Sequence, residues 1–208
     1  MPELKISGFV FLSFLLFSCS SSSGVPKTAL AGLRGKDPVS MGTIEAQTPA
    51  PPGEEGVLLS LFYYPEDEVL SIRFLYETVS YRQFWDRNAV GVLTAALSRY
   101  EADYNQADFS QKSAGAPGRA YGRVLLMAEW QSFSFSGVFL SYPYLDLGYS
   151  LGNAGPCFTL LQREAGEQNF PSRNIKSRRI VLYLSLSEAR ALSASLNALR
   201  NALHADQE

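Results

Sequence analysis

The chain has 208 residues, 46% of them hydrophobic and 18% charged, with a formal net charge of −2 at pH 7. This near-neutral balance provides no long-range attraction to nucleic acid, so we expect no nucleic-acid partner. The single histidine excludes a zinc site built from several histidines.

The N-terminus consists of a short polar head and an apolar run over residues 8–17. A helix that spans a membrane needs roughly 20 apolar residues, so this run is too short to span one. Its length is typical of the apolar core of a secretory signal, which is normally cleaved away.

Leu16-Phe17-Ser18-Cys19, followed by four serines, resembles the lipobox of bacterial lipoprotein precursors. The resemblance implies a signal peptide over residues 1–18, cleavage between Ser18 and Cys19, and lipidation of Cys19. Each buried methylene contributes about 0.8 kcal/mol, so two or three acyl chains would attach the protein stably to a membrane. The resemblance therefore implies an exported protein of the cell envelope with a lipid anchor in a bacterial membrane. The alternative is an ordinary signal peptide that contains a cysteine.

Lipidation of Cys19 would leave Cys157 without a partner for a disulfide. Free cysteine is among the most often buried residue types, so we expect Cys157 to be buried and unreactive.

Residues 19–55 are rich in Pro, Gly, Ser, Thr and Ala and show no sustained hydrophobic period. This composition is typical of a tether. We therefore expect the lipidated cysteine and a flexible tether over residues 19–55, followed by one globular domain over residues 56–208.

The first predicted elements of this domain are two strands, over residues 57–64 and 69–79, with a polar turn between them. Ser80 and Gln83 match a capping box, which predicts a helix that continues to about Tyr104. Apolar residues at spacings of three and four give this helix one apolar stripe. A surface loop is expected over residues 105–122.

The second half of the domain shows the same order of strands followed by a helix. Further strands are predicted over residues 123–136, 138–147, 157–163 and 178–185. Ser185 and Glu188 form a second capping box, before an amphipathic helix that ends near His204.

These elements predict an α+β fold, with an antiparallel sheet of about six strands and two amphipathic helices packed on one face. The matching order in the two halves is also consistent with a degenerate repeat of strands followed by a helix.

Aromatic and basic residues provide the main indication of a binding surface. Phe133 and Phe135 are expected in the core, whereas Tyr142 and Tyr144 fit a core and a binding surface equally well. A basic cluster follows in the sequence, and it consists of Arg173, Lys176, Arg178 and Arg179. These side chains fit contacts with lipid headgroups or with an acidic partner, and they also fit an ordinary solvated loop.

The sequence contains no recognisable catalytic constellation, phosphate-binding loop or calcium loop, so we expect no cofactor and no metal. Three functions remain open. The first is a binding or envelope-assembly module with protein partners. The second is a carrier of a small or lipidic apolar ligand in a pocket between sheet and helices. The third is an enzyme, for which the sequence provides no support.

Overall fold

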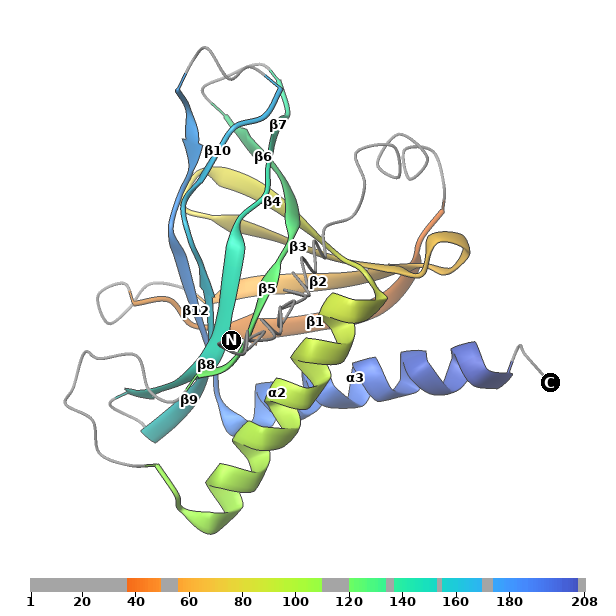
Figure 1. The fold of residues 1–208 in the computed structure, drawn as a ribbon, viewed down its shortest axis with the longest axis vertical. Helices are drawn as coiled ribbons and strands as arrows, with labels where there is room; N and C mark the ends of the chain where they lie inside the picture. Colours follow the sequence, from red (N-terminus) through yellow and green to blue (C-terminus); the bar gives the residue numbers. More distant parts are fainter. Residues whose placement is uncertain are drawn as a thin grey trace, which may run out of the picture.

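Helices and antiparallel strands form an α+β fold, as predicted, in a computed structural model of the chain (Figure 1). The structure describes residues 37–49, 56–109, 120–133, 137–152, 155–169 and 174–205, and the side chains of residues 200–205 are excepted. The predicted signal peptide, Ser18 and Cys19 lie outside the described residues.

The larger sheet has six strands in the order β1-β2-β3-β4-β6-β7. They are β1 (Val39–Ala46), β2 (Val57–Tyr64), β3 (Val69–Tyr76), β4 (Val79–Trp85), β6 (Met127–Ser132) and β7 (Phe139–Ser141). A short 3-10 helix, η1 (Pro65–Asp67), lies in the turn between β2 and β3.

The smaller sheet has four strands in the order β12-β9-β8-β5. They are β5 (Ala120–Leu125), β8 (Tyr144–Gly152), β9 (Gly155–Gln162) and β12 (Ile180–Leu184). A further pair, β10 (Ala165–Gly166) and β11 (Lys176–Ser177), continues from β9 and leads into β12.

Strand β1 lies within the segment that we expected to be a tether, so that expectation is wrong for Val39–Ala46. The strand pairs with β2, and it places the Ile44 and Ala46 side chains in the main core. Its pattern is difficult to recognise because Gly42, with φ at 100°, interrupts the alternation at an irregularity in the pairing. The fold therefore begins before residue 56.

The predicted capping box at Ser80 is also wrong, because residues 79–85 form strand β4. Tyr81 and Trp85 are buried in the main core, whereas Ser80 is exposed, and this alternation is that of a strand. Helix α2 (Arg87–Gln106) begins after Asp86, whose carboxylate accepts a hydrogen bond of 2.7 Å from the Ala89 N–H.

Two predicted strands each divide between the two sheets. Residues 123–136 contain the end of β5 and all of β6, which are separated at Leu126. Residues 138–147 contain β7 and the start of β8, which are separated at Pro143. Pro143 has no N–H to continue a ladder, and its carbonyl accepts a 3.0 Å hydrogen bond from the Leu126 N–H. The chain thus passes twice from one sheet to the other at the same corner.

The two sheets enclose a common interior. At the edges away from the corner, the backbones of Gln47 and Tyr183 exchange two 2.8 Å hydrogen bonds. Four aromatic side chains form one row across the inner face of the larger sheet, and they are Phe74, Tyr81, Trp130 and Phe139. The rings stack in two pairs within this row, with centroids 5.4 Å apart for Phe74 and Tyr81 and 4.5 Å apart for Trp130 and Phe139.

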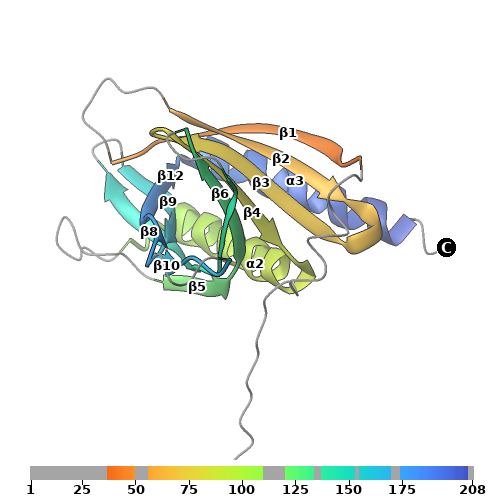
Figure 2. The same cartoon turned by 90° about the horizontal axis from the view of Figure 1, so that it is seen from above.

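Both helices pack against this interior. Helix α3 (Leu186–Ala205) begins with the predicted capping box, in which Ser185 N–H donates to Glu188 at 2.9 Å. The helices contact each other, and their buried side chains join the same core as the sheets. Seen from above, α2 lies between the two sheets, and the C-terminal end of α3 extends beyond the strands (Figure 2). The second half of the chain contributes strands to both sheets, unlike the first, so the fold fits a plain α+β arrangement better than a repeat.

A chain that begins at Gly56, the boundary expected from the sequence, should be less stable than one that begins at Asp37. It lacks β1, and loss of a buried isoleucine alone costs about 2–5 kcal/mol. Thermal unfolding of both chains, followed by circular dichroism, measures the difference. Equal midpoints would show that β1 is not part of the stable fold.

Candidate binding surface

The outer face of the four-stranded sheet presents polar and aromatic side chains away from the core. Along β8, Leu145 and Leu147 point inward and are buried, whereas Tyr144 and Asp146 lie on the opposite face. The Tyr144 side chain is prominent there, since 50% of its surface is exposed. Helices α2 and α3 pack on the inner side and leave this face uncovered (Figure 2).

Asp146 joins two arginines on this face. Its register partner on β5 is Arg123, whose Nε donates a hydrogen bond to Asp146 Oδ1. The Nε of Arg163, just after β9, donates to Asp146 Oδ2 at 2.7 Å. The Arg123 guanidinium also lies 5.8 Å from the centroid of the Tyr144 ring, within range of a cation–π interaction.

The two arginines keep the Asp146 carboxyl ionised. Partial burial by itself raises the pKa of this carboxyl. The hydrogen bonds and positive charges of Arg123 and Arg163 outweigh that effect and hold the pKa below its ordinary value of 3.8. The group of three side chains therefore carries one net positive charge at neutral pH.

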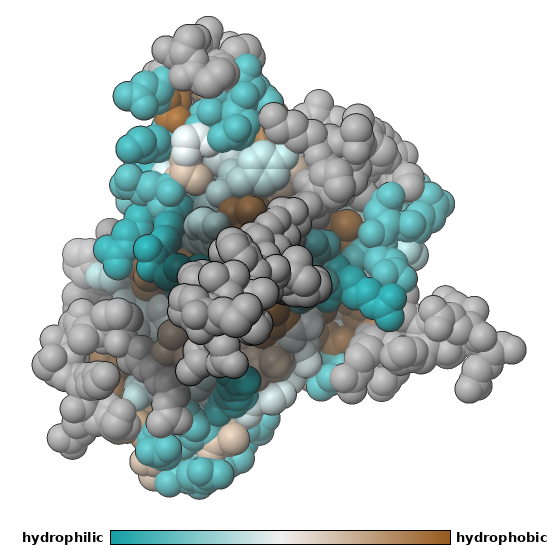
Figure 3. Space-filling view, in the orientation of Figure 1, coloured by the Kyte–Doolittle hydropathy of each residue, from teal (hydrophilic) through white to brown (hydrophobic). Residues whose placement is uncertain are grey.

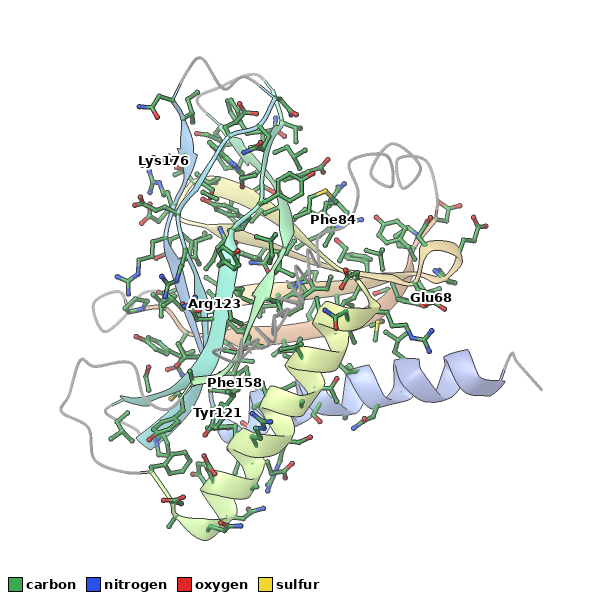
Figure 4. All side chains as sticks on the ribbon, viewed as in Figure 1. Glu68, Phe84, Tyr121, Arg123, Phe158 and Lys176 are labelled. Atoms are coloured by element: carbon green, nitrogen blue, oxygen red, sulfur yellow. The ribbon has the colours of Figure 1, made fainter. Side chains whose placement is uncertain are left out.

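Two residues of the predicted basic cluster lie at a bend of the same strands. Arg178 and Arg179, between β11 and β12, are exposed, and they lie opposite Arg163 and Glu164, between β9 and β10. Arg178 forms an ion pair with Glu77 of the β3–β4 turn. Lys176 is exposed on β11, farther along this side of the molecule than Arg123 (Figure 4).

Figure 3 shows that hydrophilic residues predominate on the side of the molecule formed by β8, β10 and β12. Only some of the residues predicted to form the binding surface lie on this side. Tyr144, Lys176, Arg178 and Arg179 lie on this side, and Arg173 lies outside the described residues. Tyr142 instead packs, partly buried, against a second small core cluster on the larger sheet.

Phe133, which we expected in the core, is 80% exposed, so that expectation is wrong. It lies in the turn after β6, and its N–H donates to the carbonyl of Thr78. Leu58 and Leu75 are exposed at the same end of the larger sheet. Phe135 lies outside the described residues.

Sequence reasoning missed Arg123 and Arg163. Arg123 lies within β5 and Arg163 lies just after β9, and no local pattern distinguishes either from other exposed arginines. Asp146 shows an indirect signal, since it lies two residues after Tyr144 and so shares a strand face with it. Only the pairing of β5, β8 and β9 brings the three side chains together.

Polar groups also occur in the interior. Gln83 Nε2 donates a 2.8 Å hydrogen bond to Gln162 Oε1, and this bond joins the two sheets. The indole N–H groups of Trp85 and Trp130 and the hydroxyl of Ser141 are buried and have no hydrogen-bond partner among the described residues. Unpaired buried donors are uncommon, and they indicate sites where a water or ligand would be stabilised.

Cys157 is half-buried, so the expected full burial is wrong, and its Sγ lies 3.7 Å from the Gly155 carbonyl oxygen. Burial and the charge of Glu188 raise the pKa of its thiol, which favours the less reactive protonated form.

Within the described ranges, no group of three or more His, Cys, Asp or Glu side chains is arranged to bind a metal ion. No helix in that part of the chain has the length and apolarity needed to cross a membrane.

The ion pairs of Asp146 should make stability depend on pH. Because its pKa is lower in the folded chain, the stabilisation is complete above the ordinary value of 3.8 and is lost as the pH falls through the folded-state value. The variant Asp146→Asn should lose less stability in acid than the wild type, by about 1 kcal/mol or less for half-exposed pairs. Urea unfolding at a series of acidic and neutral pH values tests this. Parallel curves for the two proteins would contradict it.

Comparisons with known proteins identify a family. A family model described as "Uncharacterised Treponema protein" matches residues 55–200, which include every strand from β2 onward and most of α3. No curated protein and no solved structure gives a significant match. Since the match covers well over half of the 208 residues, the chain belongs to this family of uncharacterised Treponema proteins.

Proposed function

We propose that this protein is an exported, lipid-anchored component of a bacterial cell envelope that acts by binding or assembly rather than by catalysis. The anchor is the lipid on Cys19, and cleavage between Ser18 and Cys19 makes this cysteine the first residue of the mature protein. The lipobox-like sequence supports it. Because β1 begins at Val39, residues 20–38 separate the anchor from the first strand that the structure describes.

The observation that carries the binding function is the outer face of the four-stranded sheet. Arg123, Asp146 and Arg163 form a fixed polar group beside the exposed Tyr144 ring. Half-exposed Leu161 and Val181 continue the row of Arg123 and Asp146 across the sheet. A surface that combines arginine, tyrosine and apolar side chains is typical of protein interfaces. Its excess positive charge favours a partner with acidic groups.

A second function, that of a ligand carrier, is favoured by a different observation. Trp85, Trp130 and Ser141 place unpaired donors on the inner face of the larger sheet. An apolar ligand with a few acceptor atoms would satisfy these donors while its body contacted the aromatic row.

Lipidation is tested by growing cells that produce the full precursor with a radioactive fatty acid. We expect label on the wild-type protein and none on Cys19→Ala, because the cysteine sulfur is the attachment atom. Cys157→Ala is the matched control and should keep the label. An unlabelled wild-type protein would refute the lipid anchor.

Native mass spectrometry of the protein isolated from its own membranes distinguishes the two functions. The binding function predicts a complex that Arg163→Glu dissociates and Arg190→Glu does not. These arginines are matched, since their side chains are 53% and 51% exposed and each donates from Nε to a carboxylate at 2.7 Å. The carrier function predicts a small added mass that Trp130→Phe reduces. A monomer with neither feature would count against both functions.

A further inference from the structure

Asp146 forms ion pairs with two arginines. Four other ion pairs among the described residues involve one arginine and one carboxylate each, and these are Arg82–Glu129, Arg87–Glu68, Arg178–Glu77 and Arg190–Glu101. Asp146 instead divides its two oxygens between Arg123 and Arg163. One positive charge is therefore left without a counter-charge within this group.

The geometry leaves the outer edges of both guanidinium groups available. Each arginine uses its Nε atom toward Asp146, so its two terminal nitrogens remain for other acceptors. No hydrogen bond from these terminal nitrogens to another described residue is present in the structure. The side chains of Arg123 and Arg163 are 52% and 53% exposed, so an incoming group can reach them.

Asp146 also reduces the entropic cost of binding. A free arginine side chain samples many rotamers, and a ligand must immobilise it. Here the carboxylate, 19% exposed and placed between the two arginines, already holds both. Backbone pairing fixes the group further, because Arg123 is the register partner of Asp146 and the Arg163 N–H donates to the Tyr144 carbonyl at 2.8 Å.

We propose that Arg123 and Arg163, positioned by Asp146, bind a phosphate-type anion on the outer face of the four-stranded sheet. A phosphate group offers several acceptor oxygens to two guanidinium edges, and arginine matches this geometry better than lysine does. Tyr144 flanks the site and would contact whatever carries the phosphate. The proposal rests on the proposed function only in taking this face as the binding face.

The shared chemistry has two possible sources, a lipid headgroup and a soluble phosphate ester. Both are tested with the chain from residue 19 onward that carries Cys19→Ser, so that it bears no lipid. One arm titrates this protein with inorganic phosphate by calorimetry. The other sediments it with phosphatidylcholine vesicles that contain or lack phosphatidic acid. Binding in the vesicle arm alone identifies a lipid phosphate, and binding in the phosphate arm identifies a soluble ester.

Three variants test the role of each residue. Arg163→Gln should weaken binding about tenfold, as expected for loss of charge-assisted hydrogen bonds. The matched variant Arg190→Gln should bind like the wild type. Asp146→Asn is the decisive variant, because it increases the positive charge while removing the group that positions the arginines. Positioning predicts weaker binding by this variant, whereas simple attraction predicts tighter binding.

Three results would overturn the proposal: no binding in either arm, equal losses for Arg163→Gln and Arg190→Gln, or tighter binding by Asp146→Asn. Such a result leaves the proposed function standing if Arg163→Glu still dissociates the native complex. Conversely, phosphate binding without any native complex would support the anion site and count against a protein partner.

Discussion

The fold depends on the corner where the Leu126 N–H donates to the Pro143 carbonyl. Two neighbouring strand paths leave the larger sheet here and continue in the smaller one. Since the sheets share these paths, they must face a common interior, and both helices pack there. No described element consequently covers the outer face of the smaller sheet, and this leaves Tyr144 and the arginines beside it exposed.

Polar groups are treated differently on the two sides of the sheets. On the outside, water screens the arginines, so Asp146 can hold two of them at little cost. On the inside, no solvent compensates an unpaired donor. The hydrogen bond between Gln83 and Gln162 pairs one amide N–H with one amide oxygen and joins the two sheets. The indole N–H groups of Trp85 and Trp130 in this interior have no hydrogen-bond partner in the part of the chain that the structure describes. The largely apolar interior therefore contains polar groups that can form specific hydrogen bonds.

Elements with a strong period could be predicted from the sequence, whereas the bends between them could not. The second helix was predicted with its cap, because Ser185 and Glu188 satisfy each other's backbone groups locally. The similar pattern at Ser80 was misleading, since pairing with β3 and β6 fixes that segment as a strand. Strand β1 was missed because Ile44 and Ala46 are its only buried residues, and its stability comes from pairing with β2.

The amino-acid sequence is sufficient to recognise the α+β class, the family and the lipobox-like N-terminus, because each depends on residues that are close together in the chain or on their overall pattern. The binding surface depends instead on the pairing of strands that are far apart in the chain. Tyr144 was a candidate from the sequence, but Arg123 and Arg163 were not, since neither lies in a local motif. The pairing of β5, β8 and β9 brings these distant residues to one carboxylate, and strand register is set by long-range packing.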